Sequence, residues 1–175
     1  MPSQNVIVAL DKRYDFSKFD CGEPALNDYL KCRAGQEMAS SVSAIFVLPY
    51  EGVVIGFYTL CACSIKRSSL PLEFNKRLPK YERLPTVLIG RMAVDKSYQG
   101  CGAGKMLLVN ALKRSFEQSR QVGAIAVMVD AKDEKASAFY KHFGFQEIPL
   151  RPLRLFISMK RISALKLDQL DRVES

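Results

Sequence analysis

Histidine is nearly absent from this chain, because His142 is the only one among 175 residues. Metal sites that need two histidines are therefore excluded, and a Ser-His-Asp triad would have to use this single residue. The five cysteines are odd in number and form no CxxC pair, which argues against a disulfide framework and a zinc site and predicts buried free thiols. Proton transfer is therefore assigned to a carboxylate, a tyrosine, a thiol or the substrate itself.

Long hydrophobic runs are also missing. No apolar run approaches the roughly 18 residues that a membrane span needs, and the first ten residues lack the basic-then-apolar order of a signal peptide. Internal repeats and low-complexity segments are absent, and the 48% hydrophobic and 25% charged composition is typical of a globular protein. We expect one soluble, cytoplasmic domain that covers residues 1–175, with disorder limited to its ends.

Positive charge is in excess, with a formal net charge of +8. Such a balance favours nucleic acid or a phosphorylated ligand as partner, although a well-charged surface alone would also produce it. The excess is concentrated in residues 66–83, called here the basic stretch, where six basic residues stand against two glutamates. It is interpreted as a solvated loop with one or two helical turns, or as part of a polyanion-binding face. Its basic residues are Lys66, Arg67, Lys76, Arg77, Lys80 and Arg83.

Hydrophobic periodicity predicts alternating strands and helices. Proline at position 24 marks a helix start, and Gly123 marks a helix stop. The order predicts an α/β or α+β domain with a mixed sheet that contains at least one antiparallel hairpin. The expected strands are 5–10, 42–48, 53–65, 86–94, 124–129 and 153–159, and the expected helices begin at 24 and span 105–122 and 133–142.

The segment YQGCGAGK, residues 98–105 and called here the glycine loop, places three glycines at alternate positions just before a predicted helix. Unpaired amides at a helix N-terminus bind phosphate oxygens. A P-loop is excluded because Met106 follows Lys105 and Gln99 stands at the first glycine position, and the spacing does not fit GxGxxG. A tight glycine turn that only caps the helix is the structural alternative. The pattern that residues 99–104 meet in full is Gln/Arg-x-x-Gly-x-Gly/Ala.

With that pattern the sequence resembles the GNAT superfamily of acetyl-CoA-dependent N-acetyltransferases. Two further motifs carry the resemblance, namely RMAV at residues 91–94 and AFY at 138–140 followed by Gly144-Phe145. The resemblance implies a GNAT fold, in which a central mixed, mostly antiparallel sheet is splayed at the cofactor site and flanked by helices. It implies acetyl-CoA as cosubstrate and no metal. The cofactor-binding residues that it implies are Met92, Ala93, Val94, Gln99, Gly100, Cys101, Gly102, Ala103, Gly104, Lys105, Asp133, Ala138, Phe139 and Phe143.

A narrower resemblance is to the TacT/AtaT-like toxins of bacterial toxin–antitoxin pairs. It is carried by FDCGE at 19–23, GFYTL at 56–60, Leu84-Pro85 before Gly90-Arg91, and Val122-Gly123. It implies acetylation of the α-amino group of aminoacyl-tRNA, which blocks translation. It also implies a ribbon-helix-helix antitoxin, repression of the toxin's own operon through operator DNA bound by the antitoxin complex, and a homodimer in the bacterial cytoplasm.

The chemistry of acetyl transfer can be distributed over these positions. Tyr140 is the candidate acid, because a phenol with a reference pKa near 10 stays protonated at neutral pH, and the resemblance assigns the same residue. A backbone amide of the strand from Met92 to Val94 can polarise the thioester. No carboxylate is placed by a motif as general base, which suits an α-amine with a reference pKa of about 7.7 to 8.0 better than a lysine near 10.4.

The basic stretch, together with Arg91, is expected to contact the phosphates of the tRNA acceptor stem. Three positions depart from the family pattern. Cys101 and Ala103 replace larger residues of relatives, and Asp133 stands where many relatives carry asparagine. Two other functions stay open, namely a GNAT that acetylates a protein or small-molecule amine, and a basic nucleic-acid-binding module.

Overall fold

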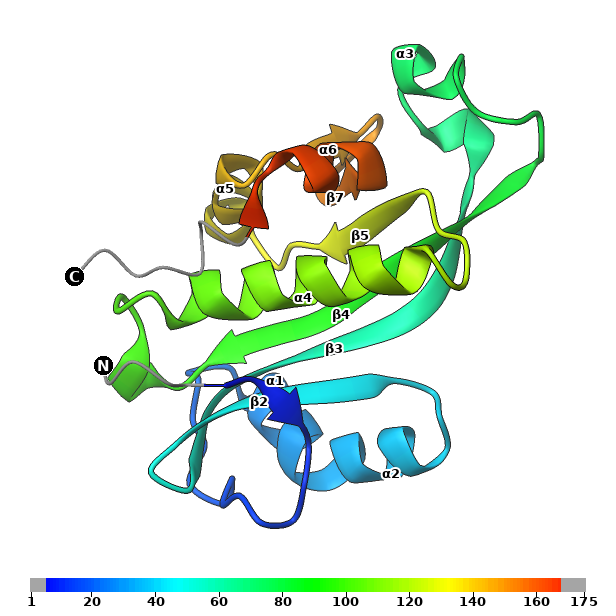
Figure 1. Ribbon diagram of the computed structural model, residues 1–175. Helices are drawn as coiled ribbons and strands as arrows, with labels where there is room; N and C mark the ends of the chain where they lie inside the picture. The colour runs from blue at the N-terminus through cyan, green and yellow to red at the C-terminus, as the bar shows by residue number, and fades with distance from the viewer. Residues whose placement is uncertain (1–5, 168–175) are drawn as a thin grey trace. The chain divides into compact units, whose positions relative to one another are not determined.

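The computed structural model describes residues 6–167 (Figure 1). By its internal contacts the chain divides into two compact units. Unit 1 comprises residues up to Cys61 together with Gly90–Ala111, and unit 2 comprises Ala62–Ile89 together with the residues from Leu112 onward. Strands β3 (Val53–Lys66) and β4 (Arg83–Val94) and helix α4 (Ala103–Ser119) each contribute residues to both units.

The described strands form one sheet in the order β1-β2-β3-β4-β5-β7-β6. The pairs β1–β2, β2–β3, β5–β7 and β6–β7 are antiparallel, whereas β4 and β5 pair in parallel. The parallel register joins residues 87–89 of β4 to residues 127–129 of β5, and β4 continues beyond it as Gly90–Val94. The sheet is therefore mixed and mostly antiparallel, as predicted. The remaining strands are β1 (Val8–Ala9), β2 (Ala44–Tyr50), β5 (Ala126–Asp130), β6 (Gln146–Ile148) and β7 (Arg151–Ser158).

Unit 1 begins with a helical segment in three parts, α1 (Pro24–Asp28), a π-helical turn (Tyr29–Arg33) and α2 (Ala34–Ala39). Pro24 occupies the first turn of α1, where its missing N–H costs nothing. In the core of the unit, the ring of Phe57 lies 5.6 Å from that of Phe19 and 6.1 Å from that of Tyr29. The hairpin of β2 and β3 turns through Glu51 and Gly52, both with positive φ, so the predicted turn is confirmed.

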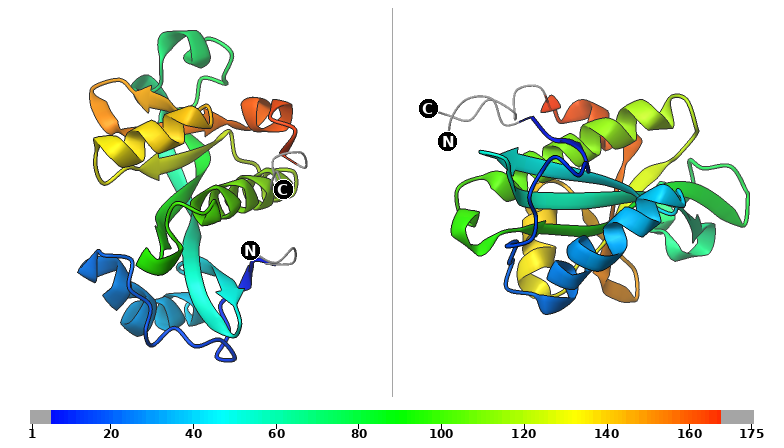
Figure 2. Two further views of the ribbon diagram at one scale, coloured as in Figure 1. Left: turned by 90° about the vertical axis from the view of Figure 1, so that its left-hand side faces the viewer. Right: turned by 90° about the horizontal axis from the view of Figure 1, so that it is seen from below.

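Unit 2 has its own core, in which Leu84, Met128 and Phe156 are buried. Helices α5 (Glu134–His142) and α6 (Met159–Ala164) both contact β7 (Figure 2). The basic stretch contains a short 3-10 turn (Arg67–Ser69) and α3 (Leu72–Asn75), which confirms the prediction of one or two helical turns. Phe74 of α3 contacts Phe156 with ring centroids 5.2 Å apart, so this segment is tied to the core of the unit.

Several predicted boundaries were wrong. Helix α4 ends at Ser119 rather than at residue 122, because the Ser119 hydroxyl donates to the carbonyl of Phe116 at 2.7 Å and competes with the helix ladder. The first predicted strand is reduced to Val8–Ala9, and its residue Asn5 lies outside the described residues. Strand β6 and helix α6 were not predicted. Helix α6 begins where the Ser158 hydroxyl accepts from the amide of Arg161 at 3.1 Å.

The cysteines also differ from expectation, because all five are free and none is buried. Two of them, Cys32 and Cys101, are exposed. Over residues 6–167, no helix is long and apolar enough to cross a membrane. The same residues contain no group of three or more His, Cys, Asp or Glu side chains that could hold a metal ion.

Candidate active site

Two side chains, those of Asp95 and Gln99, hold the start of the glycine loop in place within unit 1. Asp95 accepts from the amide of Ser97 at 2.9 Å and from the amide of Asp20 at 3.0 Å. The Gln99 side-chain nitrogen donates to the carbonyls of Cys21 at 3.1 Å and Val94 at 2.9 Å. The predicted binding residue Gln99 therefore shapes the loop with its side chain, and the loop leaves the strand in a fixed direction.

The backbone of the loop then turns so that amides are left without partners. Gly100 and Gly102 have φ of +79° and +88°, and a Cβ atom at either position would meet nothing within 4 Å. The first bond into α4 runs from the amide of Met106 to the carbonyl of Gly102 at 3.0 Å. Within the described part of the chain, the amides of residues 100–105 donate to no other group. Unpaired amides, open space and a 17-residue helix behind them suit a phosphate group.

The remaining loop side chains are small or already used. The Cys101 thiol is exposed and donates to the carbonyl of Tyr98 at 2.7 Å, and Ala103 is buried. Gly104 and Lys105 are half-buried in the first turn of α4. Among residues 92–94 only Ala93 is buried. The loop therefore offers mainly its backbone, which suits a phosphate group.

We predict that Gly102→Val raises the dissociation constant for acetyl-CoA by at least about tenfold. Valine at positive φ costs on the order of 1–3 kcal/mol, and its side chain would fill the space that is open beside the amides. Isothermal titration of the variant with acetyl-CoA measures the effect. The matched control is Gly52→Val, which imposes a similar strain at φ +80° in the β2–β3 turn. If both variants lose equal affinity, the loop does not bind the cofactor.

Tyr140 projects from α5 in unit 2. The helix begins at Asp133, whose carboxylate accepts from the amide of Ala136 at 2.8 Å, so Asp133 is an N-cap. The Tyr140 side chain is only 8% exposed, and its ring lies 5.3 Å from that of Phe139 and 5.5 Å from that of Phe145. Burial raises the pKa of Tyr140 to about 12. Its hydroxyl has no hydrogen-bond partner among residues 6–167, so it stays protonated at neutral pH and can donate a hydrogen bond to a ligand.

The other predicted residues of α5 differ in exposure. Ala138 is exposed, and Phe139 and Phe143 are half-buried with ring centroids 5.2 Å apart. Asp133 is exposed, and its carboxylate caps α5 and lies 4.0 Å from the Lys132 ammonium, so the structure gives it a structural role without assigning a cofactor contact. The α5 segment therefore presents Tyr140 from an aromatic cluster.

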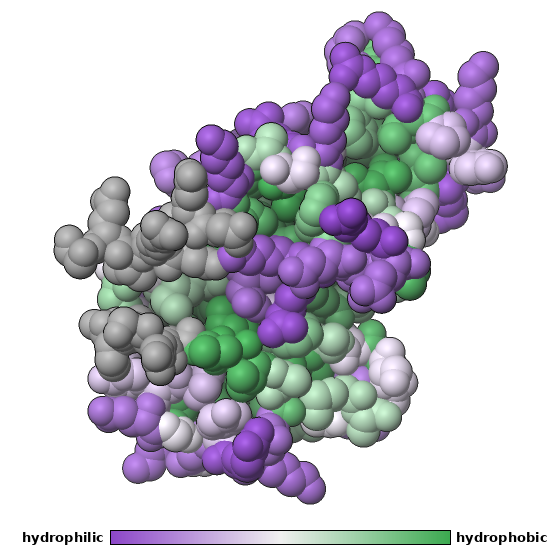
Figure 3. All heavy atoms as spheres, in the orientation of Figure 1, coloured by the Kyte–Doolittle hydropathy of each residue, from purple (hydrophilic) through white to green (hydrophobic). Residues whose placement is uncertain are grey.

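Six of the seven predicted tRNA-binding residues belong to unit 2, and three of them are tied down. Arg67 donates to the carbonyl of Asn75 at 3.0 Å, Lys76 pairs with Glu73 at 2.9 Å, and Arg83 donates to the hydroxyl of Ser64 at 2.8 Å. The outer side chains around α3 are largely hydrophilic in Figure 3. Three members of the stretch, Lys66, Arg77 and Lys80, are exposed and form no ion pair with any described residue.

Arg91, the seventh predicted tRNA-binding residue, belongs to unit 1. Its guanidinium contacts Tyr29 and Glu37, a cluster that the sequence analysis did not predict. Its guanidinium lies 3.8 Å from the ring centroid of Tyr29 and 3.9 Å from the carboxylate of Glu37. The Tyr29 hydroxyl donates to that carboxylate at 2.8 Å, and burial followed by this bond raises the pKa of Tyr29 to about 12. Arg91 therefore offers a tRNA phosphate fewer free donors than the sequence suggested. Sequence reasoning also missed Arg151 and Arg154 of β7, for which no motif gave a signal.

The structure combines a mixed sheet, a glycine loop at a helix N-terminus and a buried tyrosine on a short helix. These features are typical of an α/β enzyme that binds a phosphorylated ligand. Residues 41–147 match the family model described as "Acetyltransferase (GNAT) domain". The chain is 37% identical over 151 residues to a tRNA-acetylating toxin of Mycobacterium tuberculosis. The aligned residues cover 86% of this chain and 90% of the relative. The chain belongs to the GNAT acetyltransferase family.

Solved structures of similar proteins agree with that assignment. A tyrosine-to-phenylalanine mutant of KacT superposes with a TM-score of 0.86 at 33% identity, covering 91% of this chain and 98% of KacT. AtaT complexed with acetyl-methionyl-tRNAfMet has a TM-score of 0.85 at 35% identity, with the same coverage. Further similar structures are AtaTR bound with AcCoA, an AtaT mutant bound to the C-terminus of the antitoxin AtaR, and a KacTA–DNA complex.

Proposed function

We propose that this protein is an acetyl-CoA-dependent N-acetyltransferase that acetylates the α-amino group of aminoacyl-tRNA and so acts as a toxin that inhibits translation. The observation that carries the proposal is the similarity, over 86% of the chain, to a tRNA-acetylating toxin. The unpaired amides of the glycine loop support it independently, because they suit the pyrophosphate of the acetyl donor. Acetyl-CoA supplies the activated acetyl group as a thioester.

Three groups of this chain carry out separate parts of the proposed acetyl transfer. The amides of residues 100–105 bind and orient the donor, and a backbone amide between Met92 and Val94 stabilises negative charge on the thioester oxygen. The Tyr140 hydroxyl donates a hydrogen bond to the departing sulfur. Because the pKa of Tyr140 is about 12 and that of a thiol is about 8.5, complete transfer of the proton is uphill. The hydroxyl therefore acts mainly by stabilising the charge that develops on sulfur.

The acceptor amine must be neutral to attack, and this gives a pH prediction. We expect kcat/KM to rise with pH and to level off near the pKa of the acceptor α-amine, at or below about 8. Deprotonation of Tyr140 should lower kcat/KM only near pH 12, because this tyrosine is protonated below its raised pKa. Single-turnover assays between about pH 6 and pH 9 test the ascending limb and its plateau, and no descent from Tyr140 is expected in this range. A rate that still climbs tenfold per pH unit at pH 9 would indicate a lysine-like acceptor and contradict the proposal.

The partners follow from the same proposal. Similar proteins have been solved with an antitoxin C-terminus and with DNA. We therefore expect an antitoxin to bind this chain and the resulting complex to bind the operator DNA of their operon. The family resemblance further implies that the antitoxin has a ribbon-helix-helix fold. A homodimer in the bacterial cytoplasm is the expected state of the toxin.

Acetylation of total charged tRNA with labelled acetyl-CoA tests the function directly. We expect label on the aminoacyl group, recovered as an N-acetyl amino acid after mild base hydrolysis. Equal rates on lysine peptides would instead support the second candidate, a GNAT for protein amines. Expression in bacteria is expected to arrest growth, and the arrest should depend on the transferase activity.

A further inference from the structure

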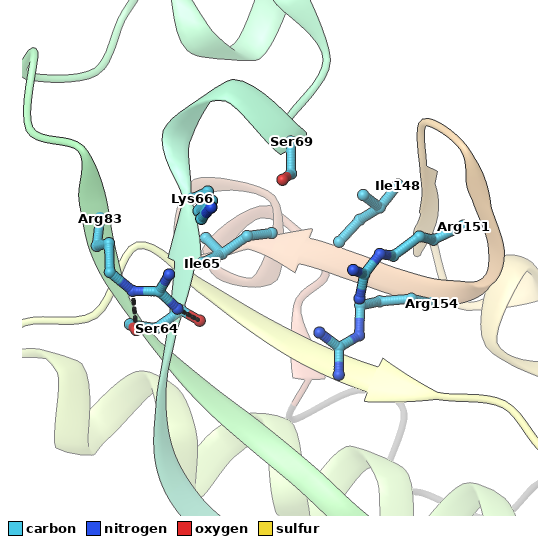
Figure 4. A pocket seen from close by; sticks show the side chains of 8 residues that line it. All are labelled: Ser64, Ile65, Lys66, Ser69, Arg83, Ile148, Arg151 and Arg154. Carbon is cyan, nitrogen blue, oxygen red and sulfur yellow. Dashed lines mark hydrogen bonds between the residues drawn. The ribbon is translucent and has the colours of Figure 1, made fainter.

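Unit 2 contains a hollow of about 150 Å³ whose lining is rich in cations (Figure 4). Two cations of the basic stretch, Lys66 and Arg83, line it together with Arg151 and Arg154 of β7. Ser64, Ser69, Ile65 and Ile148 complete the lining, and these eight residues are called here the basic pocket. Figure 4 shows Arg83 extending into it from one side and Arg151 and Arg154 from the other. Segments about 70 residues apart in the sequence thus converge on one site.

Most donors of the basic pocket are unused. Arg83 uses donors for the hydroxyl and carbonyl of Ser64, and Arg154 uses two for a bidentate pair with Asp130 at 2.6 and 2.8 Å. Since a guanidinium carries five donors, each retains several. Lys66 and Arg151 form no ion pair or side-chain hydrogen bond with any residue in the described range. The lining itself contains no carboxylate, so its positive charge is compensated only at Arg154.

The rest of the lining strengthens attraction for an anion. Ile65 and Ile148 are 5% and 1% exposed and form an apolar wall, which lowers the local dielectric constant. Two serines, Ser64 and Ser69, add hydroxyl groups. Arginine, lysine and serine side chains are the groups that contact backbone phosphates in nucleic-acid complexes. The volume holds on the order of five water-sized molecules, which is enough for one phosphate group with bound water.

We propose that the basic pocket is a phosphate-binding site, separate in sequence from the glycine loop, that holds one backbone phosphate of the acceptor tRNA. The assignment to tRNA rests on the proposed function, whereas the assignment to phosphate rests on the pocket alone. Lys66 and Arg151 bind the phosphate directly with their free donors. Arg83 and Arg154 are positioned by Ser64 and Asp130 and add the donors that remain.

The phosphate claim is tested without any enzymatic activity. Inorganic phosphate is titrated into the protein while the side-chain N–H signals of arginine are followed by NMR. We expect saturable shifts at Arg151 and Arg154 that are stronger than those caused by equal concentrations of acetate. In the double variant Lys66→Gln/Arg151→Gln, the phosphate-induced shift of the Arg154 signal should be lost. In the control Lys160→Gln, which removes an exposed charge of α6 outside the pocket, the shifts of both arginines should be retained. Absent shifts, or shifts at least as strong with acetate, would overturn the proposal.

The tRNA claim is tested by the salt dependence of binding. Each phosphate contact on duplex RNA or DNA contributes about 0.9 to the slope of log K against log salt, or about fivefold in affinity at 0.15 M salt. If Lys66 and Arg151 share one phosphate, the double variant should lose about fivefold in affinity and about 1 in slope. A loss of about 2 in slope would mean two separate phosphates, and no loss would mean that the pocket does not meet tRNA; either result overturns the proposal. Should the wild type acetylate no charged tRNA, the proposed function fails, and the NMR titration still decides the phosphate claim.

Discussion

Tyr140→Phe is expected to lower kcat for acetyl transfer to charged tRNA by about 10²–10³-fold, the loss that follows removal of one hydrogen-bond donor to a charge that develops in the transition state. The dissociation constant for acetyl-CoA should stay within about twofold of the wild-type value, because the glycine loop is unchanged. Single-turnover kinetics with labelled acetyl-CoA and isothermal titration measure the two quantities.

The size of this effect follows from what the substitution leaves in place. Phenylalanine keeps the ring packed against Phe139 and Phe145, so the fold of α5 is preserved. Only the hydroxyl is lost, and it has no hydrogen-bond partner among residues 6–167, so its removal should not weaken the fold. The pKa of about 12 adds a stability signature, because a folded pKa above the unfolded value near 10 makes stability fall as pH rises from about 10 to 12. That fall should be smaller in Tyr140→Phe.

The matched control is Tyr58→Phe. Tyr58 is fully buried and donates to Asn110 at 2.6 Å, so this change removes a tyrosine hydroxyl that has a structural partner. We expect a loss of about 1 kcal/mol or more in the free energy of unfolding, with kcat nearly unchanged. If Tyr140→Phe reduced kcat no more than Tyr58→Phe, the hydroxyl of Tyr140 would have no role in the chemistry.

The elements that sequence reasoning predicted well are those with a local cause. The β2–β3 turn needs positive φ at Glu51 and Gly52, and the glycine loop needs it at Gly100 and Gly102, so glycines mark both turns. Helix α5 has its cap in Asp133 and its buried positions at Ser137 and Tyr140. In each case a few neighbouring residues are sufficient to specify the backbone.

The misses have causes that lie outside such windows. Tyr29 and Glu37 are eight residues apart, a spacing that leaves two residues about 80° apart around a regular α-helix. The π-helical turn between them inserts about one extra residue, so the two side chains meet and hold Arg91. The contacts of Arg91 therefore could not be predicted from the spacing in the sequence. The basic pocket is a similar case, because β7 brings Arg151 and Arg154 to Lys66 through sheet pairing, which no local pattern encodes.

Arg77→Glu/Lys80→Glu is expected to weaken binding of charged tRNA by about 10²-fold at 0.15 M salt. Loss of one phosphate contact costs about fivefold at this salt concentration, and charge reversal adds repulsion to that loss. Both residues are exposed and have no ion pair with any residue in the described range, so their reversal should leave the fold intact. Arg83 is a poorer choice, because its bond to Ser64 joins β4 to β3. Filter binding of charged tRNA across a salt series measures the affinity and its slope.

The control for this pair is Lys160→Glu, an equal kind of reversal on α6. If only long-range attraction acts, each reversed charge should lower the affinity for tRNA by a similar factor, so the double variant should lose about the square of the loss in Lys160→Glu. A defined surface on the basic stretch predicts a loss in Arg77→Glu/Lys80→Glu that is much larger than this. The affinity for acetyl-CoA should be unaffected in every variant, since the glycine loop is untouched. An Arg77→Glu/Lys80→Glu protein that acetylates charged tRNA at the wild-type rate and KM would show that the acceptor stem lies elsewhere. Of the six cations of the basic stretch, only Lys66 and Arg83, which line the basic pocket, would then be left to contact tRNA.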